Sequence, residues 1–176
     1  MKHIIAFGGS NSRNSINKKL AVLAANNLKN TSFTILDLND FEIPIYSIDH
    51  ENNIGIPEDV SKFNALIFAA DGIILSLAEH NGSYTVAFKT LLDWLSRIDK
   101  NVWKNKPMLL MSTSPGGRGG ASVFDTASNM FPRLGADIVG HFSLPFFPKN
   151  YSGEKLLDKE FSQDFLSEIE KFEQSL

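Results

Sequence analysis

The sequence predicts a doubly wound α/β fold, in which one five-stranded parallel sheet carries helices on both faces. Apolar runs of strand length alternate with amphipathic helical stretches through most of the 176 residues. These runs are almost continuously apolar, which is typical of parallel strands buried on both faces. Right-handed crossovers then distribute the helices over both sides of the sheet. No repeat or linker interrupts the alternation, so we expect a single domain over residues 1–176.

The strands and helices follow one another in a regular order. The first strand ends at a cluster of Gly, Ser and Asn, and apolar residues recur on one helical face from Ser15 to Leu28. Residues 38–56 have no sustained period and are predicted to form a long loop. Pro57 suits the first position of the next helix. The predicted strands are 4–7, 33–36, 72–77, 107–112 and 137–144, and the predicted helices are 15–28, 57–67, 84–97, 119–134 and 159–172.

Composition excludes several classes of function. A net charge of −3 argues against a nucleic-acid scaffold, because such a protein needs a basic surface. The absence of cysteine excludes disulfides, iron–sulfur clusters, thiolate zinc sites and a cysteine nucleophile. No stretch approaches the roughly 20 apolar residues of a membrane span, and the first residues do not resemble a signal peptide. We therefore expect a cytoplasmic protein that binds neither nucleic acid nor membrane.

The loop that follows the first strand has the composition of an anion site. Ligands of an open parallel sheet collect beyond the carboxyl ends of its strands. Residues 8–17 lie at such an end and combine two glycines, several hydroxyl and amide side chains, an arginine and a helix N-terminus. The loop lacks the Walker ending and the spaced glycines of a dinucleotide site, so a phosphate monoester is the expected ligand. The alternative is a plain capped turn with Ser15 as N-cap.

Two further loops at the same edge have unusual compositions. Residues 77–83 contain Glu79 and His80, followed by an Asn-Gly pair typical of a tight turn. A plain turn and a ligand loop are equally good interpretations there, and a lone Glu-His pair does not predict a metal site. Residues 112–120 are rich in glycine, which lets a backbone approach a flat ligand or simply forms a flexible linker. The coincidence of three such loops favours a binding site.

Together the three loops resemble those of the NAD(P)H-dependent FMN reductase family, which has flavodoxin-like architecture and includes quinone, azo-dye and chromate reductases. The first loop is similar to the family's Gly-Ser-x-Arg-x-x-Ser-x-Asn, with Ser12 at the Arg position and Arg13 one residue later. Residues 78–83 are similar to Pro-Glu-Tyr-Asn-Gly-Ser, with Ala for Pro and His for Tyr. Residues 112–120 match Ser-x-Ser-Pro-Gly-Gly-x-Gly-Gly.

The resemblance implies a flavodoxin-like three-layer sandwich that binds FMN and uses NAD(P)H as co-substrate. It implies hydride transfer from NAD(P)H through flavin N5 to a quinone, an azo compound or a flavin, so no catalytic side chain is assigned. It also implies a homodimer or homotetramer. The residues expected to bind the cofactor are Ser10, Ser12, Arg13, Ser15, Ile16, Asn17, Ala78, Glu79, His80, Asn81, Ser114, Pro115, Gly116, Gly117, Gly119 and Gly120.

Several alternatives remain open from the sequence. Arg118 is a candidate for the phosphate of NAD(P)H, for a subunit contact or for a solvated loop charge, and His80 for contact with the ring edge or substrate. A flavodoxin-type electron carrier would bind FMN without a nicotinamide site, although carriers of that kind are usually far more acidic. A nucleotide- or phosphosugar-binding domain would have no redox role. A serine hydrolase would need a Gly-x-Ser-x-Gly elbow, which the sequence lacks.

Overall fold

The computed structural model describes all 176 residues and contains a five-stranded sheet with the strand order β2-β1-β3-β6-β7. Every pair of neighbouring strands is parallel. This is the flavodoxin-like order, with its topological switch point between β1 and β3, so the predicted fold class is confirmed. The strands are β1 (Lys2–Gly9), β2 (Thr31–Leu36), β3 (Gly72–Leu77), β6 (Lys106–Thr113) and β7 (Ala136–Leu144).

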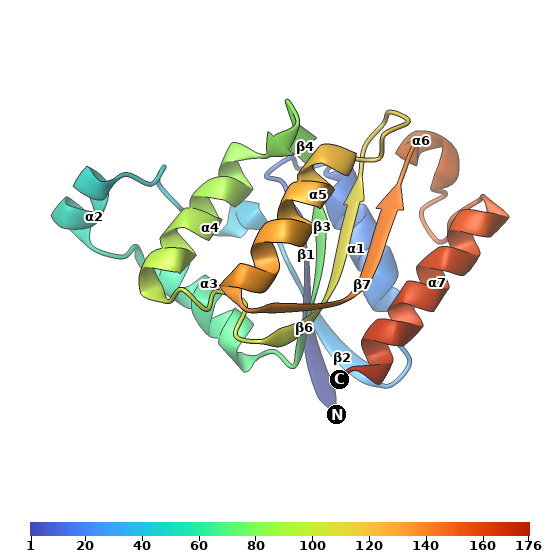
Figure 1. Cartoon of the computed structure of the whole chain (residues 1–176), viewed down its shortest axis with the longest axis horizontal. Coiled ribbons are helices and arrows are strands. Elements are labelled where there is room, and N and C mark those ends of the chain that lie inside the picture. Colours follow the sequence, from blue (N-terminus) through green and yellow to red (C-terminus); the bar gives the residue numbers. More distant parts are fainter.

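Helices cover both faces of the sheet (Figure 1). Side chains that alternate along β1 point to opposite faces, so Ile4 packs in one core layer and Ile5 in the other. The first layer lies under α1 (Ile16–Asn26) and α7 (Lys159–Gln174). The second lies under three helices, which are α3 (Glu58–Ala69), α4 (Val86–Ile98) and α5 (Ala121–Met130).

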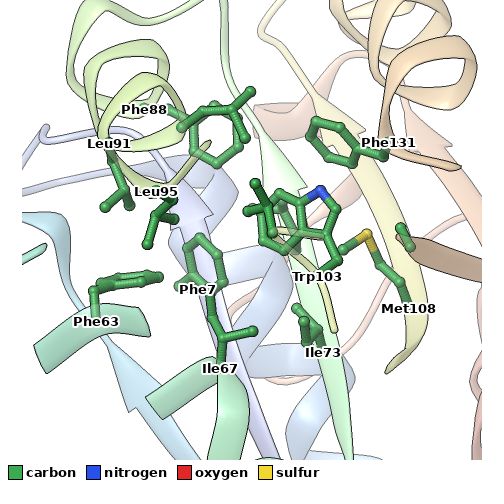
Figure 2. Close-up of a cluster of buried hydrophobic side chains, with 14 of the residues drawn as sticks. Phe7, Phe63, Ile67, Ile73, Phe88, Leu91, Leu95, Trp103, Met108 and Phe131 are labelled. Atoms are coloured by element: carbon green, nitrogen blue, oxygen red, sulfur yellow. The ribbon is translucent and has the colours of Figure 1, made fainter. Parts of the chain in front are cut away.

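The larger core layer, part of which is shown in Figure 2, contains seven aromatic side chains among its 25 buried residues. The rings of Phe7 and Phe63 meet edge to face with centroids 5.3 Å apart, and the Trp103 and Phe131 centroids lie 4.9 Å apart. All four side chains are fully buried. Burial of each ring contributes on the order of 2 to 3 kcal/mol to stability. The strand ends that carry the loops therefore rest on a rigid, well-packed platform.

The prediction of one long loop over residues 38–56 is wrong, because this segment contains two short helices. One is the 3₁₀ helix η1 (Leu38–Asp40), and the other is α2 (Ile48–Ile54), which projects from the body of the protein in Figure 1. No residue of α2 is buried, so the segment has no apolar face that a periodic pattern could reveal. Its first turn is fixed instead by Ser47, whose hydroxyl accepts from the His50 N–H.

Other predicted boundaries shift for local reasons. The helix expected from Tyr84 begins two residues later, because Tyr84 belongs to a hairpin of β4 (Glu79–His80) and β5 (Ser83–Tyr84). The helix expected at 119–134 starts after two glycines with positive φ and continues beyond α5 as the 3₁₀ helix η2 (Phe131–Leu134). Pro57 is the N-cap rather than the first residue of α3. The structure adds the short helix α6 (Phe147–Asn150), which periodicity did not predict.

We expect acidification to release α2 from the body of the protein. Arg97 Nε of α4 donates to Glu51 Oε2 at 2.8 Å, and Tyr46 Oη donates to the same oxygen at 3.0 Å. The hydrogen bond from Arg97 lowers the pKa of Glu51, and desolvation opposes this only in part. Because the pKa of Glu51 is lower in the folded protein, the ionised carboxylate stabilises the folded state fully at a pH above its ordinary pKa of 4.5. This stabilisation is lost as the pH falls through the lowered pKa.

Hydrogen-exchange protection of residues 48–54 measures this effect. The wild-type protein should lose protection below pH 4.5, whereas Glu51→Gln should show low protection at neutral pH as well. Equal protection of the variant and the wild-type protein at neutral pH would contradict the prediction.

Candidate functional site

A cleft of about 270 Å³ opens at the carboxyl ends of β1, β3 and β6, and all three loops singled out in the sequence contribute to its wall. Asn14 and Thr113 also line it; both belong to the loops 8–17 and 112–120, but neither was among the residues expected to bind the cofactor. Thr113 is the last residue of β6, at the point where the third loop begins. The predicted residues that line the cleft are Ser10, Ser12, Ser15, Ile16, Asn17, Ala78, Glu79, His80, Ser114 and Pro115.

The remaining predicted residues belong to the same loops but lie outside this lining. Arg13 is an exposed residue of the first loop, and Asn81 lies at the tip of the β4–β5 hairpin. The glycines follow Pro115, which lines the cleft, and connect it to α5. They are Gly116, Gly117, Gly119 and Gly120.

The N-terminus of α1 faces the cleft with two unpaired donors. Ser15 is the N-cap, and its hydroxyl accepts from the Lys18 N–H at 3.1 Å. The N–H groups of Ile16 and Asn17 have no acceptor within the protein, as expected for the first residues of a helix. Unpaired N–H groups at the positive end of a helix are suited to an anion, as the sequence predicts for this loop, and we refer to this turn as the cradle. Ser15 is therefore an N-cap, and a capped turn is compatible with the predicted anion site.

The side chain of Asn17 forms hydrogen bonds within the protein. Its Oδ1 accepts from Ser76 Oγ at 2.7 Å and from the Thr113 N–H at 3.0 Å, and its Nδ2 donates to the Thr113 carbonyl at 3.1 Å. Only 2% of the residue is exposed. The amide thus connects the first turn of α1 to β3 and β6, and it holds the cradle in place through these two strands.

Glu79 connects the second loop to α5, the helix that follows the third loop. Its Oε2 accepts from the Val123 N–H at 3.0 Å. The N-cap of α5 is Gly120, which has no side chain to cap the helix, so Glu79 supplies a carboxylate to the positive end of α5. The hairpin that carries Glu79 turns through Asn81 and Gly82, with φ of 51° and 76°, as the Asn-Gly pair predicts.

Among the basic side chains near the cradle, Lys18 has a carboxylate partner, Asp37. Burial alone would raise the pKa of Asp37, but hydrogen bonds from Lys18 and Asn39 outweigh it and lower that pKa. The ammonium of Lys18 is therefore paired with a carboxylate. Arg13 has no hydrogen bond or salt bridge within the protein, and Arg118 donates only to Ser122 Oγ at 3.0 Å. Both loop arginines therefore lack a carboxylate partner within the protein.

A second cleft of about 390 Å³ adjoins the first at His80, which lines both. Its wall comes from the segment after β2 and from the first turns of α4, and it contains no Asp, Glu, Lys or Arg. Six of its lining residues are apolar, namely Leu38, Phe41, Ile43, Ile45, Val86 and Ala87.

Comparison with known proteins assigns the chain to a family. Residues 2–149 match the family described as NADPH-dependent FMN reductase, and the match extends over most of the chain. The chain belongs to this family.

One relative of this FMN reductase family member is an NADPH:quinone oxidoreductase of Arabidopsis thaliana. The two sequences are 32% identical over 130 residues, which cover 72% of this chain and 66% of the relative. A quinone reductase of Escherichia coli (strain K12) is 35% identical over 80 residues, which are 46% of this chain and 43% of the relative. The chain thus matches about half to two thirds of the length of these curated relatives.

A solved structure supports the fold over the full length. The flavoenzyme NAD(P)H:(acceptor) oxidoreductase FerB of Paracoccus denitrificans aligns with a TM-score of 0.78 and 23% identity, and the alignment covers 99% of this chain and 97% of that one. At this identity the likeness shows the flavodoxin-like architecture.

Proposed function

We propose that this protein binds FMN in the cleft at the ends of β1, β3 and β6 and catalyses oxidation of NAD(P)H by a quinone, an azo compound or a flavin. The unpaired N–H groups at the start of α1 carry the proposal, because they suit the terminal phosphate of FMN. Family membership supports the cofactor and the reaction class. No helix has the length and apolar character needed to span a membrane.

We expect the phosphate and the ring of FMN to lie against different parts of the cleft wall. The phosphate would lie on the N–H groups of Ile16 and Asn17, with the hydroxyls of Ser10 and Ser12 at the same wall. The flat ring would lie against the backbone of the 78–81 hairpin and the 114–120 loop, where small residues permit close approach. The groups that would contact FMN are therefore mostly backbone amides and short side chains.

The protein's own part in the reaction is binding and orientation. FMN, when bound, supplies the hydride chemistry. Glu79 holds the hairpin against α5, and Asn17 holds the phosphate cradle against β3 and β6, so both residues fix the relative position of the loops. The guanidinium groups of Arg13 and Arg118, neither of which pairs with a carboxylate, suit the phosphates of NAD(P)H. The uncharged cleft beside His80 suits a neutral ring such as a quinone.

Three further features belong to the same proposal. One continuous sheet with two core layers supports a single FMN-binding domain over residues 1–176. Exposed apolar side chains on α2 and at the start of α4 support assembly into a homodimer or homotetramer, among them Ile48, Ile54 and Val86. We also propose that the protein acts in the cytoplasm, which suits a chain without cysteine.

Spectroscopy of the purified protein tests the function directly. Addition of FMN should quench flavin fluorescence, and anaerobic addition of NADPH should bleach the visible flavin absorbance. Reoxidation by a quinone should restore the absorbance. A protein that binds FMN but stays oxidised with both NADH and NADPH would be an electron carrier, and a protein that takes up no FMN would contradict the proposal.

Substitution of Ile16 tests the phosphate cradle. Ile16→Pro removes one unpaired N–H, and proline is well tolerated at the first position of a helix. The lost charge-assisted hydrogen bond should weaken FMN binding about tenfold. Ile16→Ala is the matched control, because it removes the same side chain but keeps the N–H. Equal FMN dissociation constants for the two variants would show that this N–H does not bind the phosphate.

A further inference from the structure

The segment after β7, which is not one of the three loops discussed above, is hydrogen-bonded to the glycine loop (residues 114–120). The Phe146 N–H donates to the Gly116 carbonyl at 2.9 Å, and the Phe147 N–H donates to the Ser114 carbonyl at 3.1 Å. Figure 1 shows α6, which begins at Phe147, next to the loop between β6 and α5 at the upper edge of the sheet. A fourth segment therefore takes part in shaping this edge.

The side chain of Phe146 lies directly against Gly117. A Cβ atom built on Gly117 would come within 2.7 Å of Cζ and 3.2 Å of Cε2 of the Phe146 ring. No side chain fits at position 117 while the ring stays where it is. Lys149 Nζ lies 5.1 Å from the ring centroid, within the range of a cation–π contact. The ring thus has the glycine loop and the Lys149 ammonium as neighbours, and 43% of Phe146 remains exposed.

Phe146 makes these contacts in an unfavourable backbone conformation. Its φ and ψ are 48° and 49°, the left-handed region, which is sterically unfavourable for an L-residue but not for glycine. The surroundings hold it there, because Phe147 is buried and Asn150 Nδ2 donates to the Pro145 carbonyl at 2.9 Å. Strain of this kind concentrates at sites where geometry serves function.

We propose that Phe146 is a positioning residue of the cofactor site, which acts on the flavin ring through Gly116 and Gly117. The phenyl ring of Phe146 packs on Gly117, and the Phe146 N–H donates to the Gly116 carbonyl. These contacts hold the backbone of the glycine loop in the orientation that meets the flavin ring. The inference rests on the proposed FMN function. It assigns Phe146 no contact with the reacting atoms.

Replacement of the ring provides the first test. Phe146→Ala keeps the backbone N–H but removes the contact with Gly117, and we expect faster hydrogen exchange in residues 114–120 of the cofactor-free protein. The FMN dissociation constant should rise about tenfold, and the reduction potential and visible spectrum of bound FMN should shift. Phe146→Tyr keeps the ring and should restore all of these values. The matched control is Phe68→Ala, which removes an exposed phenylalanine on α3 and should change none of them.

A double-mutant cycle tests the contact itself. Gly117→Ala places a methyl group against the Phe146 ring and should weaken FMN binding. Gly117 has no positive φ, so the alanine causes no backbone strain of its own. In the Phe146→Ala background the methyl group has room, and its effect should largely disappear. An equal loss in both backgrounds would show that the methyl group meets something other than Phe146 and would overturn the proposal.

The failures of the two proposals are distinguishable. If wild-type protein takes up no FMN, the proposed function fails, and the hydrogen-exchange comparison still decides whether Phe146 holds the loop. If wild-type protein binds FMN and Phe146→Ala binds it equally well with an unchanged spectrum, the proposed function stands and the role of Phe146 is refuted. The expected pattern is FMN binding by wild type, loss in Phe146→Ala and recovery in Phe146→Tyr.

Discussion

Gly8→Ala should lower the free energy of unfolding by about 3 kcal/mol. A Cβ atom on Gly8 would lie 2.5 Å from the Lys18 nitrogen, 2.9 Å from the Lys18 Cα and 3.0 Å from the Asn17 carbonyl carbon. All three are backbone atoms of the first turn of α1, which cannot rotate aside as a side chain could. The helix must therefore move away from β1, although the Asn17 side chain ties it to β3 and β6.

The same displacement should weaken FMN binding, because the N–H groups proposed to hold the phosphate belong to this turn. Chemical denaturation of the cofactor-free protein measures the stability, and fluorescence titration measures the affinity. Gly116→Ala is the matched control for stability, since the nearest atom to its added Cβ is 4.0 Å away and its φ is not positive. A Gly8→Ala protein as stable as the Gly116→Ala protein would show that α1 adjusts without cost.

The sequence was sufficient for the parts of the fold that are buried on two sides. The run at 72–77 is fully buried in β3, and burial on both faces leaves few alternatives to a parallel strand. The position of the site followed from the same pattern, because the carboxyl ends of the strands must share one edge. The loops after β1, β3 and β6 indeed line one cleft.

Contacts between distant loops could not be predicted in this way. The carboxylate of Glu79 caps a helix whose Val123 N–H is 44 residues away, and the sequence showed only an acidic residue in a turn. Phe146 meets the glycine loop because β7 pairs with β6, which brings the two loops together. Its left-handed conformation leaves no compositional signal, because the signal for such a position is glycine. Local pattern therefore located the site, but the residues that hold its loops in position required the three-dimensional structure.

Asn17→Ala should lower the free energy of unfolding by about 3 to 4 kcal/mol, because three buried hydrogen bonds are lost together. The Thr113 N–H and carbonyl would remain buried without their partner, and a buried unpaired polar group costs about 1 to 3 kcal/mol. Asn14→Ala is the matched control, since Asn14 lines the same cleft but is exposed and has no hydrogen bond within the protein. Chemical denaturation without cofactor should leave the control near the wild-type value. If Asn17→Ala instead kept wild-type stability and lost only FMN affinity, its amide would bind the cofactor directly rather than hold the cradle.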